Sequence, residues 1–413
     1  MEVREGYKNT EVGVIPEDWD VETLDDISEL TSSKRIFESD YVSSGVPFYR
    51  GKEISLLNEN KKLDEEYFIS EEKYNGIKSV FGVPVKNDIL ITAVGTLGNI
   101  YLVPNNEKFY FKDGNLIWIR NIKKVLPEYL SIQLRRLRNE IINNAIGSSQ
   151  KALTIVVLKK QFFPLPPTKS EQTAIATALS DADALINSLE KLIAKKRNIK
   201  QGAMQQLLKP KEGWEVKKLG NIGKPYGGLS GKSKLDFADG KFPYIPFMNI
   251  MSNPIIDTSY VDYVNIGVDE NQNKALKGDL FFNGSSETPE EVGMCSVLLE
   301  DIPNLYLNSF CFGFRLNKDS KENGLYLSYY FRSSEGRKLF YSMAQGATRY
   351  NLSKSNFNKM EVSLPQPEQQ NEIATILSDM DAEIQALETK LEKYRKIKLG
   401  MMQNLLTGKI RLI

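Results

Sequence analysis

Two long segments of the chain carry apolar residues at alternating intervals of four and three. The resulting period of 3.5 residues is typical of a coiled-coil helix. Neither helix could bury such a stripe alone, so we expect the two helices to pack on each other. The predicted contact positions are Ile175, Leu179, Ala182, Ile186, Leu189 and Ile193 in the first helix, and Ile373, Leu377, Met380, Ile384, Leu387, Leu391 and Tyr394 in the second.

The two helices are near copies of each other. The stretch "IATALSDADALI" (175–186) returns 198 positions later as "IATILSDMDAEI" (373–384). The start of each half is also repeated, as "WDVETL" (19–24) and "WEVKKL" (214–219). Such self-similarity indicates a tandem duplication. Because the first helix delivers the chain to the second half and the second helix must leave that half, we expect the pair to be antiparallel.

The ends of both helices are marked in the sequence. Thr168 and Glu171 form a candidate capping box, and Pro367 is a favourable first residue for the second helix. Pro210 and Gly408 are the expected stops. The segment before Trp19 resembles the one that joins the first helix to the second half. We therefore expect the two termini of the chain to lie close together.

Gly202 and Gly400 interrupt these helical patterns at equivalent places. Each glycine costs about 1 kcal/mol relative to alanine in a helix. Two explanations are open: the helix frays or kinks near its end, or its backbone lies close to a packed partner helix.

The stretches that precede the helices alternate short apolar runs with polar turns, which predicts mixed α and β structure. The predicted fold class is α+β: two mixed domains separated by two long helices that form an antiparallel coiled coil, in a pseudo-twofold, circular arrangement. The predicted domains are residues 1–164 and 211–362, and the helical segments are residues 165–210 and 363–413. We expect strands at 46–54, 88–94, 115–120, 242–250, 278–283 and 311–316, and helices at 127–145 and 324–344.

Polar and basic loops recur at equivalent places in the two halves. Arg and Lys pair with guanine or phosphate, Asn and Gln with adenine, and Ser and Thr with either. Solvated surface explains any single loop, but the recurrence favours a shared binding task. The paired loops are 31–35 and 229–234, 92–99 and 283–290, and 147–153 and 346–352. The candidate DNA contacts are Lys34, Arg35, Arg50, Lys52, Thr92, Thr96, Ser149, Gln150, Lys151, Lys232, Lys234, Asn249, Asn283, Ser285, Arg349 and Asn351.

The composition excludes several kinds of chemistry. The 413 residues include no histidine and two cysteines, so Ser-His-Asp triads, HExxH metal sites and disulfide frameworks are impossible. We expect no catalytic and no metal-binding residues. With no signal segment and no apolar run long enough for a membrane span, we expect a cytoplasmic protein without membrane contact. The net charge of +1 is low for a free-standing DNA-binding domain.

Several motifs resemble one known family. They are the helix entry "LPxPxxQ", the helix "IATxLSDxD", and the exit "GxMxxLLTGKIRL" that ends at Leu412. The strand-loop patterns "GxPFYR" and "KxDIL" of the first domain add to them. Together with the order of domain, helix, domain, helix, they resemble the specificity subunits of type I restriction–modification systems over the whole chain.

The resemblance implies a function for each part. Each domain would be a target recognition domain that reads one half of a bipartite site in double-stranded DNA. The helices would separate the domains and dock two methyltransferase (modification) subunits, which recruit restriction subunits. The chain itself would be non-catalytic and hold no cofactor, with S-adenosylmethionine, ATP and Mg²⁺ on the partner subunits. A helix of about 57 Å would limit the half-site spacing to about 17 base pairs.

Two other classes of function are weighed against this one. A coiled-coil adaptor whose domains bind proteins and not DNA would share the helices, and only the loop chemistry separates it. A self-contained nuclease or methyltransferase is disfavoured by missing motifs. The stretch "GGLSGKS" (227–233) is one residue too short for a phosphate-binding loop, and no Asn-Pro-Pro-Tyr-like tetrapeptide occurs.

Overall fold

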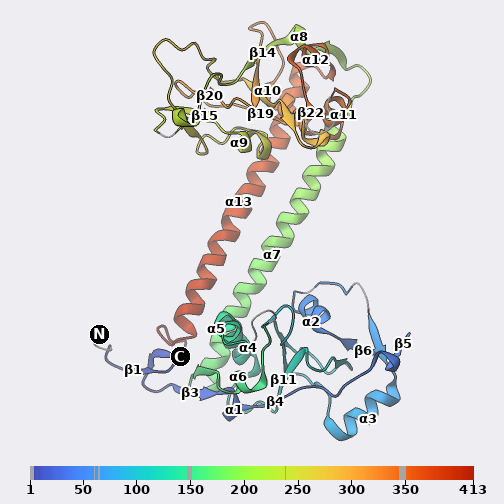
Figure 1. Ribbon diagram of the computed structural model, residues 1–413, viewed down its shortest axis with the longest axis vertical. Coiled ribbons are helices and arrows are strands. Elements are labelled where there is room, and N and C mark those ends of the chain that lie inside the picture. The colour runs from blue at the N-terminus through green and yellow to red at the C-terminus, as the bar shows by residue number, and fades with distance from the viewer. Residues whose placement is uncertain (1–3, 60, 64–65, 147–150, 238, 344–349) are drawn as a thin grey trace. The chain divides into compact units, whose positions relative to one another are not determined.

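The structure is a computed structural model that describes residues 4–413 except 60, 64–65, 147–150, 238 and 344–349. The chain forms two compact units, one of Met1–Leu189 with Lys390–Ile413 and one of Glu190–Thr389. The division falls inside the two long helices, α7 (Lys169–Leu207) and α13 (Pro367–Leu405) (Figure 1). Each unit therefore holds one domain, the start of one long helix and the end of the other.

The first domain is built on two four-stranded sheets. One is antiparallel with the order β4-β11-β8-β9, and the other has the order β10-β6-β7-β5 with a single parallel pair, β10 with β6. The strands are β1 (Tyr7–Thr10), β2 (Gly13–Pro16), β3 (Asp20–Thr23), β4 (Glu29–Thr31), β5 (Tyr41–Val42), β6 (Val46–Tyr49), β7 (Tyr67–Ile69), β8 (Ile89–Thr92), β9 (Ile100–Leu102), β10 (Tyr110–Phe111), β11 (Leu116–Arg120) and β12 (Phe162–Leu165). The helices are α1 (Leu24–Ile27), α2 (Gly51–Asn58), α3 (Glu71–Phe81), α4 (Pro127–Arg136), α5 (Arg138–Asn143) and α6 (Ile155–Lys159), with a 3-10 turn η1 (Glu38–Asp40).

The central sheet of this domain is covered on both faces. Ile91 and Ile117 belong to the larger core, whereas Leu90 and Trp118 belong to a second apolar cluster that includes Ile54 of α2. Alternate residues of a strand point to opposite faces, so a sheet buried on both faces reads as a continuous apolar run. This explains why strands β8 and β11 were predictable from their sequences.

The second domain repeats this plan with a different sequence. Its antiparallel sheet has the order β14-β21-β17-β19, and its second sheet, β16-β15-β20, also contains one parallel pair. The strands are β13 (Glu215–Lys218), β14 (Gly223–Gly227), β15 (Phe242–Ile245), β16 (Asp262–Val264), β17 (Leu280–Asn283), β18 (Ser285–Ser286), β19 (Cys295–Val297), β20 (Tyr306–Leu307), β21 (Cys311–Leu316), β22 (Tyr350–Asn351) and β23 (Glu361–Leu364). The helices are α8 (Leu219–Ile222), α9 (Phe247–Ser252), α10 (Gly324–Arg332), α11 (Ser334–Met343) and α12 (Lys354–Lys359), with turns η2 (Lys234–Phe237) and η3 (Pro289–Glu291).

Two strand predictions were wrong in their second halves. The runs 46–54 and 242–250 begin as β6 and β15 but continue as helices α2 and α9. In the first domain, the carboxylate of Glu53 accepts a hydrogen bond from the backbone N–H of Arg50 at 2.8 Å, which caps α2. In the second domain, Pro246 precedes the first turn of α9. A short apolar run does not by itself separate a buried strand from a buried helix.

A motif glutamine joins each domain to its long helix. The amide oxygen of Gln172 in α7 accepts from the backbone N–H of Leu126 at 2.8 Å, and its nitrogen donates to the carbonyl of Pro166 at 3.0 Å. Gln370 in α13 does the same with the N–H of Asn323 at 3.0 Å and the carbonyl of Pro365 at 2.9 Å. Leu126 and Asn323 are the N-cap residues of α4 and α10. The "LPxPxxQ" entry thus fixes where each helix leaves its domain.

Ion pairs join the two long helices inside each unit. In the second unit, Arg197 of α7 pairs with Glu388 of α13 at 2.6 Å, and Lys200 pairs with Asp381. Residue numbers rise along one helix as they fall along the other, so the helices are antiparallel there. In the first unit the equivalent pair joins Lys398 to Asp183. Lys398 stands 198 positions after Lys200, and Asp183 stands 198 positions before Asp381. The predicted α+β fold class with antiparallel helices is confirmed.

The start and end of each long helix also serve the domain cores. Ile175 and Leu179, at the start of α7, lie in the core of the first domain with Leu405 and Leu406 from the end of α13. Ile373 and Leu377, at the start of α13, lie in the core of the second domain with Leu208. Of the other predicted contact positions, Ala182, Met380, Leu387 and Tyr394 are half-buried and the rest are buried.

The C-terminal tail is held against the N-terminal segment (Figure 1). Arg411 forms a two-bond ion pair with Asp18 at 2.8 and 2.9 Å and a second with Glu171 at 2.5 and 2.9 Å. The hydroxyl of Tyr7 donates to the carbonyl of Gly408 at 3.2 Å. Gly408 has φ +71°, and an added Cβ would lie 2.4 Å from Pro16. The segment that follows α13 therefore contacts residues 7–18, near the start of the chain, which agrees with the prediction.

The capping-box prediction was half right. The hydroxyl of Thr168 accepts from the backbone N–H of Glu171 at 3.2 Å, as such a cap requires. The carboxylate of Glu171 does not complete the box, because it binds Arg411.

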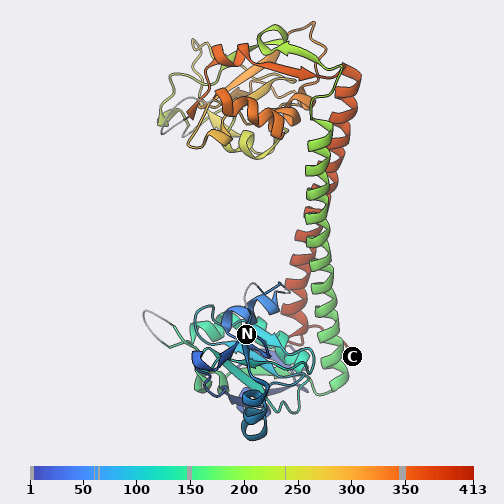
Figure 2. The same ribbon diagram turned by 90° about the vertical axis from the view of Figure 1, so that its right-hand side faces the viewer.

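The interior glycines of the long helices do not mark a close helix contact. An added Cβ at Gly202 or Gly400 would have nothing within 4 Å. Both helices also run on without a break through these positions (Figure 2). Close approach to a partner helix at these glycines is therefore excluded, and neither helix ends at its glycine.

The role of the α13 end in the first domain can be tested by truncating one side chain. Leu406→Ala removes a fully buried side chain from the core and should cost about 2–5 kcal/mol of unfolding free energy. Chemical denaturation measures the effect. Leu399→Ala, at a position 58% exposed on the same helix, is the matched control and should change stability by less than about 0.5 kcal/mol. Equal effects of the two changes would contradict this role.

Arg411 can be tested in the same way. Arg411→Ala leaves the buried carboxylate of Glu171 without its partner, so the loss should be at the low end of about 3–5 kcal/mol. Asp18→Asn removes a half-exposed partner and should cost no more than about 1 kcal/mol.

The Asp18 pair also predicts a pH dependence. The hydrogen bonds from Arg411 hold the pKa of Asp18 below its ordinary value of 3.8. The stability it contributes is therefore present above pH 3.8 and is lost as the pH falls further. Asp18→Asn should remove this part of the acid sensitivity, as followed by denaturation across the acid range. An unchanged acid profile would contradict the assignment.

Candidate nucleic-acid interface

A short loop after strand β8 is tied together by its own side chains. Thr92, at the end of the strand, is buried; its hydroxyl donates to the carbonyl of Thr96 and accepts from the N–H of Asn99 at 2.9 Å. The Asn99 amide donates to the hydroxyl of Ser55 in α2 at 2.7 Å. The loop 92–99 is therefore anchored to α2, while Thr96 at its tip is exposed.

The second domain has an equivalent loop after strand β17. Asn283 ends this strand and is fully buried. Its amide nitrogen donates to the carbonyl of Glu291 at 2.9 Å, and its oxygen accepts from the N–H of Met294 at 2.6 Å. A buried polar side chain thus closes the loop from inside in both domains, although the residue type differs.

A second segment lies against this loop in each domain. The N–H of Leu153 donates to the carbonyl of Ala93, and the N–H of Leu352 donates to the carbonyl of Gly284, both at 2.9 Å. In the second domain, strand β22 also pairs with β18, which places Ser285 opposite Asn351. In each domain, therefore, residues of two of the three predicted loops contact each other.

The first domain has an open pocket of about 490 Å³ at this place. It is lined by residues of α2 and of the loop after β8, including Arg50, Lys52 and Thr96. Three of the predicted contact residues, drawn from two distant stretches, are thus brought together. Lys52 is exposed at this pocket.

Arg50 is engaged within the domain. Its guanidinium pairs with the buried carboxylate of Glu53 at 2.7 Å and lies 4.1 Å from the ring centre of Tyr67. The hydrogen bond to Glu53 raises the pKa of Arg50. This residue therefore shapes the start of α2, and its contribution to DNA binding stays a prediction.

The basic loops near residues 34 and 232 differ in exposure. The ammonium of Lys34 lies 4.1 Å from the ring centre of Phe81, and Arg35 pairs with Asp113 at 2.9 Å while remaining 70% exposed. In the second domain, Lys232 is almost fully buried and binds Glu270, whose pKa this hydrogen bond lowers. Lys234 is exposed. Only part of the predicted charge therefore faces solvent.

Three of the predicted DNA contacts lie in the interior of their domains. Thr92 and Asn283 are buried and close the loops from inside, as described above. Asn249 is fully buried and donates to the carbonyls of Asp257 at 2.8 Å and Tyr260 at 2.7 Å. A side chain whose polar atoms are satisfied in the interior is not available to a base edge. Lys232 is nearly as enclosed, with 4% of its side chain exposed.

The other predicted contacts either lie outside the described residues or differ in exposure. Ser149, Gln150 and Arg349 lie outside the described residues. Lys151 and Asn351 are exposed, and Ser285 is half-buried. Whether any of these residues touches DNA remains a prediction.

An arginine that the sequence reasoning missed supports each domain's short helix. Arg332 of α10 donates to the carbonyls of Met251 at 3.2 Å and Asn253 at 2.7 Å, at the end of α9. Arg135 of α4 donates to the side-chain oxygen of Asn58, at the end of α2, at 3.5 Å and to the carbonyl of Ile100 at 3.4 Å. Both are the ninth residue of their helix, and that shared position was the available signal.

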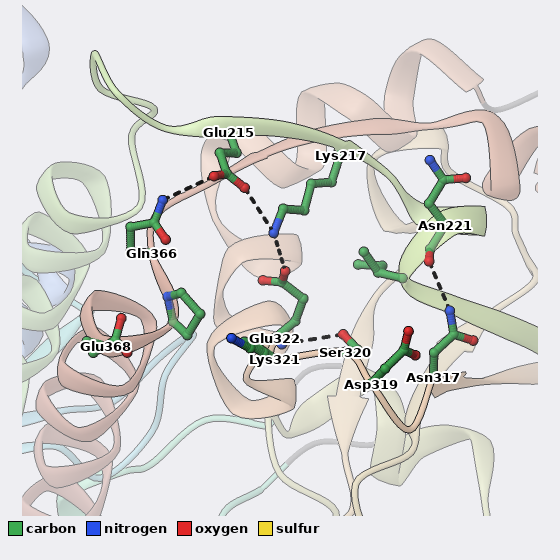
Figure 3. Close-up of a pocket in the computed structure, with 12 residues that line it drawn as sticks. Glu215, Lys217, Asn221, Asn317, Asp319, Ser320, Lys321, Glu322, Gln366 and Glu368 are labelled. Atoms are coloured by element: carbon green, nitrogen blue, oxygen red, sulfur yellow. Dashed lines mark hydrogen bonds and ion pairs between the residues drawn. The ribbon is translucent and has the colours of Figure 1, made fainter.

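A polar pocket of about 450 Å³ lies at the start of α13 (Figure 3). Lys217 pairs with Glu322 at 2.7 Å and with Glu215 at 3.2 Å. The bond to Glu322 raises the pKa of Lys217. In the first domain the same place holds Glu22 paired with Lys124 at 2.8 Å, so the two charges are exchanged. The ion pairs of this pocket join residues of the second domain to each other. The pocket lies where strand β13 meets the start of α13.

Two observations on the described residues concern metal binding and the reactivity of the thiols. Among them, no group of three or more His, Cys, Asp or Glu side chains is arranged to hold a metal ion. Burial raises the pKa of Cys311 to about 12 and also raises that of Cys295. Neither thiol is therefore ionised at neutral pH. No described helix is both long and apolar enough to cross a membrane.

The sequence profile of the type I restriction modification DNA specificity domain matches this chain twice, at residues 16–201 and 211–395. The chain belongs to this family. The two matches coincide with the two structurally repeated halves of this chain, each with one domain and most of one long helix.

Two curated relatives cover nearly all of this chain. One, provisionally named as the MjaX specificity subunit of a type I restriction enzyme from Methanocaldococcus jannaschii, is 28% identical over 98% of this chain and 97% of its own length. The MjaVIII specificity subunit of the same organism is 24% identical over 98% and 96%.

Solved structures support the fold. An S subunit of a type I restriction–modification system from M. genitalium matches with a TM-score of 0.57 at 16% identity, covering 98% of both chains. A second match, from a study of complex assembly in a type I system, has a TM-score of 0.56 at 16% identity and covers 96% and 99%. These likenesses support the fold, and the two profile matches confirm the predicted family.

The different roles of Thr92 and Thr96 can be separated by mutation. Thr92→Val leaves the N–H of Asn99 without its acceptor, so it should cost about 1–3 kcal/mol of unfolding free energy. Thr96→Ala changes an exposed side chain and should cost less than about 0.5 kcal/mol. Chemical denaturation of both variants checks the pair. A larger loss from Thr96→Ala would contradict the assignment.

Proposed function

We propose that this chain is the DNA specificity subunit of a type I restriction–modification complex and that each of its domains reads one half of a bipartite DNA site. The observation that carries the proposal is that the two domains share one framework of strands but carry different loops on it. The central sheets have the same strand order, and the loops follow the same strand in each domain. The loop sequences differ, as "TAVGTLGN" and "NGSSETPE" show.

This difference fits the reading of two unlike half-sites. The first loop exposes Gly95 and Thr96, with Lys52 at the neighbouring pocket. The second exposes Glu287 and Thr288, next to Asn351. Carboxylates accept from cytosine, while lysines and asparagines prefer guanine and adenine. Different chemistry on one frame supports different base preferences at the two halves.

The long helices are proposed to separate the domains and to dock two methyltransferase subunits, through which restriction subunits join. The antiparallel ion pairs of α7 and α13 within each unit support a paired rod. Each helix also leaves its domain through the same glutamine contact. A duplicated exit offers two equivalent places to two copies of one partner.

The chain is proposed to be non-catalytic. With no histidine and two buried thiols, its residues offer little for methyl transfer or strand cleavage. S-adenosylmethionine, ATP and Mg²⁺ would then be held by the partner subunits. The net charge of +1 further implies that partners add much of the affinity for DNA.

The proposal is tested by mapping methylated adenines in cells that carry this chain and its methyltransferase. A two-part recognition motif is expected with the unaltered chain. The double change Lys34→Glu with Arg35→Glu, or Lys234→Glu alone, should reduce methylation of that motif about tenfold or more, because reversed charge repels phosphate.

Matched charge reversals serve as controls. Lys123→Glu and Lys318→Glu alter exposed lysines in the same two domains but outside the paired loops. These variants should keep the unaltered level of methylation. Absence of any two-part motif, or equal effects of loop and control variants, would favour an adaptor that binds proteins in place of DNA.

A further inference from the structure

An arginine of the first domain grips the loop after strand β8. Arg138 is the first residue of α5. Its Nη2 donates to the carbonyl of Leu97 at 2.7 Å and its Nε to the carbonyl of Gly98 at 3.1 Å. Nη2 also lies 3.4 Å from the side-chain oxygen of Asn99. A single guanidinium therefore holds three consecutive residues of the loop.

An arginine of the second domain does the same to the loop after strand β17. Arg337 of α11 donates from Nε and Nη2 to the carbonyl of Glu290, at 3.1 and 2.7 Å, and from Nη2 to the carbonyl of Val292. Its guanidinium lies 5.3 Å from the ring centre of Phe340. Burial, together with the charge of Arg332, lowers the pKa of Arg337 to about 10. The side chain still carries its proton at neutral pH.

The two arginines are equivalent although their surroundings differ in sequence. Arg138 stands fifteen residues before Leu153, and Arg337 stands fifteen residues before Leu352. Those leucines are the residues whose backbone N–H groups bind the same two loops. The loop sequences have diverged between the halves, but the guanidinium that holds them has kept its place. The contacts run to backbone carbonyls, so they do not depend on which side chains the loop carries.

We propose that Arg138 and Arg337 are positioning residues for DNA readout, each fixing the recognition loop of its own domain. The inference rests on the proposed function and names the residues that set the loop geometry. A planar guanidinium satisfies two carbonyls at once, which a lysine ammonium does not reproduce. A loop held in its binding shape pays less ordering cost on DNA and discriminates better between bases. Each arginine acts on one domain, so its loss relaxes one half-site only.

The test uses the full chain with its methyltransferase in cells, with methylated adenines mapped across the genome. Arg138→Lys should raise methylation at sites carrying one wrong base in the half read by the first domain, relative to correct sites. The expected increase is about tenfold, the order of magnitude for one weakened contact. The other half should stay as strict as before. Arg337→Lys should produce the mirror image.

Exposed neighbours provide the matched controls. Asn139→Ala on α5 and Lys338→Ala on α11 remove side chains that make none of these loop contacts. Both should keep the unaltered methylation pattern. Purified Arg138→Lys and Arg337→Lys should have melting temperatures within a few degrees of that of the unaltered chain. This measurement separates a loosened loop from a lost fold.

Three results would overturn the proposal. The first is a lysine variant that folds and keeps full strictness at both halves. The second is equal relaxation of both halves by either variant. The third is loss of all methylation together with loss of the fold, because it would assign the arginines a purely structural role. If the unaltered chain yields no two-part motif, the proposed function itself fails.

Discussion

Each domain depends on an apolar contact supplied by a helix end that comes from the other half of the chain. Leu405 and Leu406 are buried in the first domain's core although they lie more than two hundred residues after it. Leu208, from the end of α7, is buried in the second domain's core. Burying apolar surface is the main favourable term in folding, so neither half completes its core from its own residues. The two helices are therefore parts of the domains as well as links between them.

The segments that follow the two long helices are held in different ways. In the second domain, the link from α7 to β13 is covalent and needs no further fastening. In the first domain, the segment that follows α13 is held by side chains. Arg411 binds Asp18 and Glu171 there, and Gly408 fits against Pro16 because it has no Cβ. An ion pair with a buried carboxylate thus fastens this segment to the first domain.

The duplicated frame separates what must be shared from what can differ. Backbone contacts are shared: Gln172 and Gln370 at the helix entries, and Arg138 and Arg337 at the loops. Side-chain chemistry differs, as in the exchanged charges of the Glu22–Lys124 and Lys217–Glu322 pairs. Many basic residues are neutralised internally, which agrees with the low net charge. The exposed loop tips carry different residues in the two halves.

The sequence by itself determined the large-scale plan. The 3.5-residue period, the repeat at 198 positions and the apolar runs of β8 and β11 predicted the helices, the duplication and the buried strands, because these signals are local and periodic. Only the tertiary structure decided which polar residues face outward. Thr92, Asn249 and Asn283 look like base-reading side chains, but burial turned them into internal braces. Burial depends on what packs against a residue from distant parts of the chain, and that information is absent from any short stretch of sequence.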